Sequence, residues 1–164
     1  MDALHLHLLI NHLPIIGTFL GTCILILAWS RRSEPIAVAA YFVFVISAAG
    51  AIAAYFTGEG AEEAVEHIGG ISKTSIEAHE QFAVYPLFAL ILLGILSIVG
   101  IILTQKKSRL ARKMSLILLI IAVISFMLVA WTGYLGGQIR HTELKKDQPA
   151  QNQPYRDQNL RQLP

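Results

Sequence analysis

The sequence predicts an all-α fold, an integral membrane four-helix bundle, from three observations. The 164 residues are 54% apolar and only 15% charged, whereas soluble domains are about 45–50% apolar and about 25% charged. The apolar residues gather into four runs, each longer than the ~18 residues that mark a transmembrane helix. No Asp, Glu, Lys or Arg interrupts a run. Because backbone polar groups in lipid need partners within the segment, and because the period-2 alternation of a barrel is absent, we expect helices.

The four expected helices span residues 4–29, 35–56, 82–104 and 114–135. Together they form one transmembrane domain, residues 1–141, with a loop over residues 57–81. Residues 142–164 are rich in Gln, Asn and Pro, a composition that favours a disordered polar tail. No Lys or Arg precedes the first apolar run, so we interpret this run as a retained helix and not as a cleaved signal peptide.

Charge in the loops predicts the orientation of the helices. The loop after the first run contains Arg31 and Arg32, and the segment over residues 105–113 contains five Lys and Arg residues. The loop over residues 57–81 has one cation, Lys73, against six glutamates. Short loops rich in Lys and Arg stay in the cytoplasm. We therefore expect a multi-pass protein of a bacterial inner membrane, in contact with the lipid bilayer, with both termini extracytoplasmic.

Several functional classes are not expected. The formal net charge of +2 is too small to indicate a nucleic-acid partner. The single cysteine, Cys23, excludes an intramolecular disulfide and a cysteine-only metal site, and we expect it to be a small buried hydrophobe. Neither a nucleophile elbow nor a phosphate-binding loop is present. The sequence therefore gives no positive indication of an enzyme.

All six histidines fall at the expected extracytoplasmic end of the bundle: His5, His7, His12, His67, His79 and His141. Histidine is the commonest metal ligand in proteins. At ~1.5 Å per helical residue, His5, His7 and His79 lie near one level, and His12 lies about two turns deeper. Pro14 and Pro86 follow His12 and His79. They either bend the helices beside a site or reflect the frequency of proline in membrane helices.

A b-type haem is the sharpest hypothesis for these histidines. It needs two imidazoles on facing helices at similar depth, which His79 could provide together with His7 or His12. Arg140 is placed to bind the haem propionates. The chain lacks the C-x-x-C-H motif of covalent c-type attachment.

A bare divalent metal site is the alternative. Glu63 and His67 are four residues apart, Glu59 lies one turn earlier, and Glu80 follows in the same expected loop. Such carboxylate and imidazole ligands suit Fe, Zn, Mn or Cu. The protein would then be a sensor or transport accessory. A structural membrane subunit without a cofactor is also compatible with the sequence.

Short motifs resemble a known family. The segment His7–Gly17, "HLLINHLPIIG", the pair Thr57–Gly58, the pair His79–Glu80, and Gly136, Gly137 and His141 together resemble the bacterial four-helix membrane proteins of domain of unknown function twenty-two thirty-one. The resemblance covers about residues 5–141. That family is similar to b-type cytochromes, and its relatives can be joined to Rieske iron–sulfur or cytochrome domains. The resemblance implies redox work at the outer face, with His7, His12, His79 and His141 as site residues.

These observations together predict a haem-binding or electron-transfer protein. We expect His12 and His79 as the first ligand pair, with His7 and His141 as alternates, because the family motif favours His12 whereas depth favours His7. Quinol in the membrane or a periplasmic redox protein could donate electrons. The sequence is compatible with a homo-oligomer or with a subunit of a larger complex.

Overall fold

The computed structural model describes residues 3–66 and 73–140, and these residues form helices joined by short turns, without a strand among them. The helices are α1 (Ala3–Ile10), α2 (His12–Arg31), α3 (Glu34–Glu66), α4 (Lys73–Gln105) and α5 (Ala111–Arg140). Because α1 and α2 follow one another as one membrane span, four spans are long and apolar enough to cross a bilayer. The all-α four-helix bundle is confirmed.

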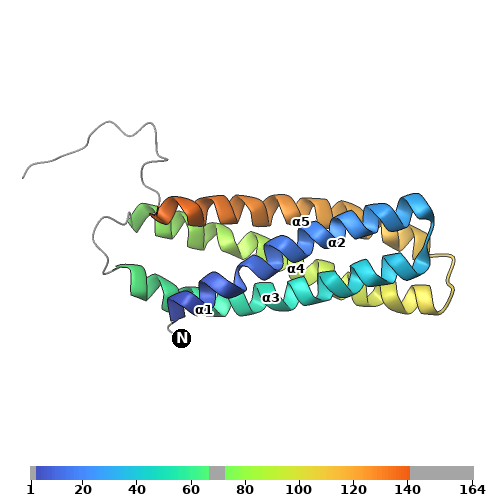
Figure 1. The fold of residues 1–164 in the computed structure, drawn as a ribbon, viewed down its shortest axis with the longest axis horizontal. Helices are drawn as coiled ribbons and strands as arrows, with labels where there is room; N and C mark the ends of the chain where they lie inside the picture. Colours follow the sequence, from blue (N-terminus) through green and yellow to red (C-terminus); the bar gives the residue numbers. More distant parts are fainter. Residues whose placement is uncertain (1–2, 67–72, 141–164) are drawn as a thin grey trace, which may run out of the picture.

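The four spans lie side by side in the chain order α2, α3, α4 and α5, and α5 closes the bundle against α2 (Figure 1). We call the end with the turns at residues 32–33 and 106–110 the basic end, because seven Lys and Arg side chains gather over residues 31–32 and 106–113. We call the opposite end, with α1 and the N-terminus of α4, the histidine end.

The helices extend well beyond the apolar runs at the histidine end. α3 continues through residues 57–66 and α4 begins at Lys73, so most of the expected loop over residues 57–81 is helical. The apolar runs end before these turns because the turns contain glutamates, which are good helix formers but are charged. α3 and α4 each have 33 residues, or roughly 50 Å of helix, whereas a hydrocarbon core is ~30 Å thick.

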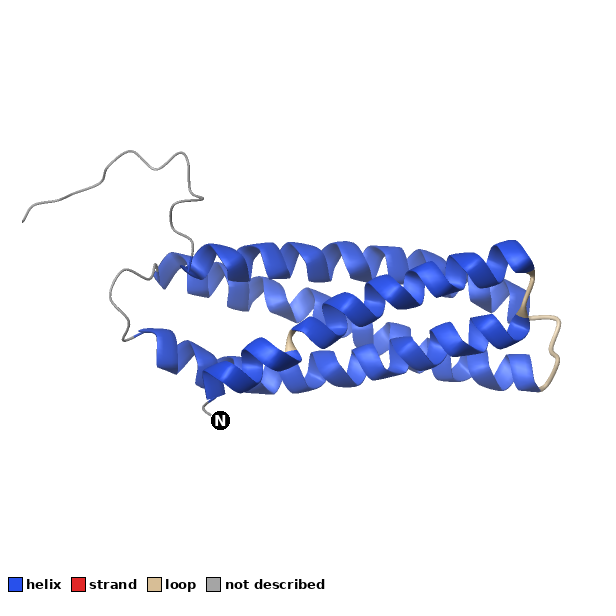
Figure 2. Cartoon of the chain, in the orientation of Figure 1, coloured by secondary structure: helices blue, strands red, loops and turns tan. Residues whose placement is uncertain are grey.

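A break at Asn11 divides the first span into α1 and α2 (Figure 2). Pro14 has no N–H group, so the carbonyl of Ile10 loses its helical partner. The N–H of Asn11 still donates to the carbonyl of His7 at 2.9 Å, which limits the break to one residue. Past the break, α1 packs chiefly on α3. Pro86, in contrast, is buried within the continuous helix α4.

The two turns at the basic end share one geometry. Arg32 and Lys107 have left-handed backbones, with φ of 50° and 51°. The next residue in each turn donates its N–H to a carbonyl five residues back, Ser33 to Ala28 and Ser108 to Leu103, both at 3.0 Å. These are Schellman motifs, which end a helix and reverse the chain. The bundle is therefore built from two hairpins, α1/α2 with α3 and α4 with α5, that turn alike.

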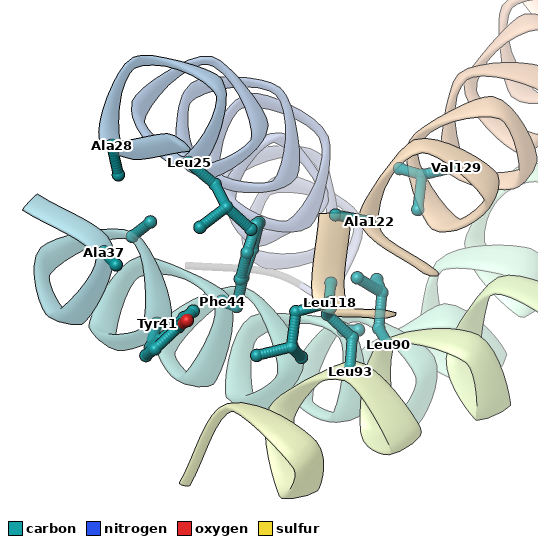
Figure 3. Packing of buried hydrophobic residues seen from close by; sticks show 12 residues of the cluster. Leu25, Ala28, Ala37, Tyr41, Phe44, Leu90, Leu93, Leu118, Ala122 and Val129 are labelled. Atoms are coloured by element: carbon teal, nitrogen blue, oxygen red, sulfur yellow. The ribbon is translucent and has the colours of Figure 1, made fainter. Parts of the chain in front are cut away.

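The main cluster of buried apolar side chains draws on α2, α3, α4 and α5 (Figure 3). Most of its members lie in the halves of these helices nearer the basic end. The largest fully buried apolar side chains are Tyr41, Phe44, Leu25, Leu90, Leu93 and Leu118. Gly21 makes room for the ring of Phe44, since a Cβ at this glycine would lie 2.5 Å from the ring. Small residues of this kind let membrane helices approach closely. Cys23, expected to be buried, is exposed, because it lies on the side of α2 that faces away from the core.

Exposed aromatic side chains lie at one level on three of the four spans, below the histidine end. Tyr55, Phe56, Tyr85, Trp131 and Tyr134 are each 45–76% exposed and belong to α3, α4 and α5. Counted from the ends of these helices at the basic end, they lie roughly 30–35 Å along the bundle. Aromatic belts of this kind mark the boundary between membrane and water. The last turns of α3 and the first turns of α4 project beyond this level.

Candidate functional site: two facing histidines

His7 extends from α1 to the backbone of α3. Its Nδ1 lies 3.0 Å from the carbonyl oxygen of Ala54 and 3.2 Å from Oγ1 of Thr57. A carbonyl oxygen can only accept a hydrogen bond, so Nδ1 carries the proton and donates it. The neutral ring then presents a lone pair on Nε2, which has no hydrogen-bond partner among the described residues. This is the tautomer in which a histidine binds a metal through Nε2.

His79 repeats this arrangement in the second hairpin. It extends from α4 to the backbone of α5, and its Nδ1 donates to the carbonyl oxygen of Thr132 at 3.1 Å. Its Nε2 also lacks a partner within the part of the chain that the structure describes. Each imidazole is therefore oriented by the helix that follows its own in the hairpin. Such outer hydrogen bonds fix the ring plane and the tautomer of metal-binding histidines.

Each ring also lies beside a glycine, four residues after the carbonyl that accepts its proton. A Cβ at Gly58 would be 3.6 Å from Cε1 of His7, and a Cβ at Gly136 would be 3.2 Å from Cε1 of His79. The His79 ring therefore lies so close to the backbone of α5 that a side chain larger than hydrogen at residue 136 would make an unusually short contact with it. The reason for glycine is steric, because glycine is the one residue that adds no Cβ atom at this position.

The two hairpins carry the same sequence spacing. His7 precedes Pro14 by seven residues, and His79 precedes Pro86 by seven residues. In both hairpins the acceptor carbonyl and the glycine then lie on the second helix. The two histidines are thus equivalent positions in two related halves of the bundle. Both histidines lie at the same end of the bundle, at similar distances along their helices from the basic end.

The site lies beyond most members of the main cluster of buried apolar side chains, toward the histidine end. His7 and His79 are half-buried, as are their neighbours Ala54, Gly58 and Gly136. Counted along the helices from the basic end, the histidines lie roughly 35–40 Å away, just beyond the aromatic belt. The helix faces beside the two imidazoles carry small residues, but Ile76 is buried and Phe82 and Leu135 are half-buried at the same end of the bundle.

His12, expected as the first partner of His79, is not brought to it. The side chain of His12 is exposed, and its Nδ1 donates to the carbonyl of Leu8 in the preceding turn at 2.7 Å. His7 and His12 are five residues apart, so their side chains point to different faces of the first span. The face with His7 packs against α3, whereas the face with His12 is exposed. His5 is exposed on α1.

Only part of the expected bare metal site is described, because His67 lies outside the described residues. Glu59, Glu63 and Glu80 are exposed, and residues 3–66 and 73–140 contain no group of three or more His, Cys, Asp or Glu side chains that could hold a metal ion. His141 also lies outside the described residues, as does the expected tail over residues 142–164. Arg140 is the last residue of α5, and its side chain is outside the description.

The residues that orient the two imidazoles were not predicted from the sequence. Ala54 and Thr132 contribute backbone carbonyls, which any residue carries, so no side-chain pattern reveals them. The repeated spacing of histidine and proline was the available signal, because it pairs His79 with His7 and not with His12. Comparison with known proteins adds no further assignment: no family model, no curated protein and no solved structure matches the chain. The family resemblance and the likeness to cytochromes stay predictions.

Proposed function

We propose that the protein binds one b-type haem between His7 and His79 and transfers electrons through it at the membrane surface. The observation that carries this proposal is the matched pair of imidazoles. Each donates its Nδ1 proton to a carbonyl of a neighbouring helix, at 3.0 and 3.1 Å, and both lie at the same end of the bundle. Both Nε2 atoms are thereby available as axial ligands.

The number of ligands favours haem over a bare ion. A protein zinc site uses three or four side chains, whereas haem iron receives four nitrogens from the porphyrin and needs only two axial ligands. Among the described residues, two histidines are oriented in this way, and no group of three or more His, Cys, Asp or Glu side chains could hold a metal ion. A two-histidine site is therefore sufficient for haem and incomplete for a structural metal ion.

The surroundings of the two rings also suit a flat macrocycle. The helix faces beside the imidazoles carry glycine at residues 58 and 136 and alanine at residues 54 and 83, which add little side-chain volume directly beside the two rings. The site lies just beyond the aromatic belt, where haem propionates would be solvated. Arg140, at the end of α5, would bind a propionate. When bound, the haem would supply a one-electron couple whose potential depends on the axial ligands and their hydrogen bonds.

The cellular setting follows from the charge distribution. The seven cations at the basic end favour a cytoplasmic location for that end, so the haem would face the extracytoplasmic side of a bacterial inner membrane. Membrane quinol or a periplasmic redox protein would exchange electrons with it. The protein would act as an electron-transfer unit, alone, as a homo-oligomer or within a larger complex, and not as an enzyme with its own substrate pocket.

The absorption spectrum of the purified protein, as isolated and after addition of haem b, tests this proposal. We expect a Soret band and sharp reduced α and β bands, and we expect His7→Ala and His79→Ala each to abolish this low-spin spectrum. His12→Ala is the matched control, because it removes an exposed imidazole five residues from His7 and should leave the spectrum unchanged. A colourless protein that takes up no haem would refute the proposal, as would a spectrum lost in His12→Ala and kept in His7→Ala.

A further inference from the structure

The two imidazoles are not held in the same way. The Nδ1 proton of His7 has two acceptors, the carbonyl oxygen of Ala54 at 3.0 Å and the hydroxyl oxygen of Thr57 at 3.2 Å. Among the described residues, the Nδ1 proton of His79 has one acceptor, the carbonyl oxygen of Thr132 at 3.1 Å. The difference lies three residues after the acceptor carbonyl, where α3 has Thr57 and α5 has Leu135.

The hydroxyl of Thr57 is fixed as an acceptor toward His7. Its Oγ1 lies 3.0 Å from the carbonyl of Ala53 and 3.1 Å from the carbonyl of Ala54, in the preceding turn of α3. These carbonyls can only accept, so the single hydroxyl proton is used within the helix. The lone pairs of Oγ1 then remain for the Nδ1 proton of His7. A threonine held in this way both restrains the ring and polarises its N–H bond.

Polarisation of the Nδ1–H bond has a predictable effect on a bound metal. A stronger hydrogen bond at Nδ1 makes Nε2 a more basic ligand, and a more basic axial ligand stabilises ferric over ferrous iron. We propose that Thr57 is a positioning residue that orients His7 and lowers the reduction potential of the haem held by His7 and His79. This inference rests on the proposed function and assigns unequal roles to its two ligands.

The internal repeat provides a reciprocal experiment. Thr57→Val removes the hydroxyl at nearly constant volume, whereas Leu135→Thr introduces one at the equivalent place beside His79. We expect Thr57→Val to favour ferrous haem about threefold, which is a rise of roughly 28 mV at 59 mV per tenfold for a one-electron couple. Leu135→Thr should lower the potential by a similar amount. Thr57→Ser keeps the hydroxyl and should restore the wild-type value, and Leu135→Val controls for the loss of leucine volume.

Redox titration of the haem-loaded protein measures these shifts. Equal potentials for Thr57→Val and Thr57→Ser, or shifts of the same sign for Thr57→Val and Leu135→Thr, would overturn the inference while leaving the haem proposal intact. A second measurement does not depend on haem. In the haem-free protein, ¹⁵N NMR of the histidine rings should show less of the Nδ1-protonated form of His7 in Thr57→Val than in Thr57→Ser. An unchanged tautomer ratio would also overturn the role of Thr57, and failure to bind haem would separately refute the proposed function.

Discussion

Substitution of Gly136 by alanine tests whether the close approach of the His79 ring to α5 matters for haem binding, because the same change should not destabilise α5. The added Cβ would lie 3.2 Å from Cε1 and 3.3 Å from Nδ1 of His79. Contacts this short are rare, so the ring must move by a few tenths of an ångström. The ring would shift relative to the carbonyl of Thr132 that orients it. Loss of such an orienting contact typically costs about 10–100-fold in metal affinity, and we expect Gly136→Ala to weaken haem binding about tenfold.

Gly136→Ala should stabilise helix α5 although it weakens haem binding. Alanine is favoured over glycine in a helix interior by roughly 0.5–1 kcal/mol, so α5 should be at least as stable in the variant. If Gly136→Ala binds haem more weakly but has an unfolding temperature no lower than that of the wild type, the loss of affinity comes from the displaced His79 ring and not from a less stable helix. Binding is measured by titration of the haem-free protein with haem b, and stability by thermal unfolding of the haem-free protein in the same detergent.

Two other glycines provide matched controls for this experiment. A Cβ at Gly137 would have no neighbour within 4 Å, and a Cβ at Gly58 would lie in ordinary contact with His7 at 3.6 Å. Gly137→Ala should therefore bind haem like the wild type, and Gly58→Ala should differ from it only slightly. Equal affinities for Gly136→Ala and Gly137→Ala would refute the reasoning, because the close approach of His79 to α5 would then have no consequence for the ligand.

Three further predictions follow from the fold. Pro14→Ala restores a backbone donor and should make the first span one continuous helix, which would carry α1 away from α3 and lower the haem content of the purified protein. Phe44→Ala empties a fully buried site and should cost about 3–5 kcal/mol, seen as a large fall in the unfolding temperature. Phe42→Ala, at a residue 54% exposed, should change it little. Lys107→Cys in a Cys23→Ser background should react with a membrane-impermeant maleimide only after cells are opened, whereas labelling of intact cells would reverse the proposed orientation.

The fold could be predicted from the sequence because lipid imposes a simple rule. A run of about 20 apolar residues in a bilayer must be a helix, so composition alone identifies the four spans. The ends of the helices could not be found in this way. The turns of α3 that contain Glu59 and Glu63 lie outside the apolar runs. Only the helix propensity of their residues could predict these turns from the sequence, and helix propensity alone is weakly predictive.

The sequence predicted the placement of the described histidines, which gather at one end of the bundle. It also proposed His79 as a ligand, which stays a prediction. For the partner of His79, the position along the helix favoured His7, whereas the family motif favoured His12. The break at Asn11 and the packing of α1 on α3 decide which face of the first span is turned inward, and neither is a property of one residue type. The carbonyls of Ala54 and Thr132 are backbone groups, so their role depends on tertiary structure alone.

Electron paramagnetic resonance of the ferric protein, loaded with haem b to saturation, tests the central proposal most directly. The paired imidazoles predict one haem per chain with a low-spin signal typical of two histidine ligands, converted to a high-spin signal in His7→Ala and in His79→Ala. Absence of stoichiometric haem, or a low-spin signal that persists when both histidines are replaced, would contradict it.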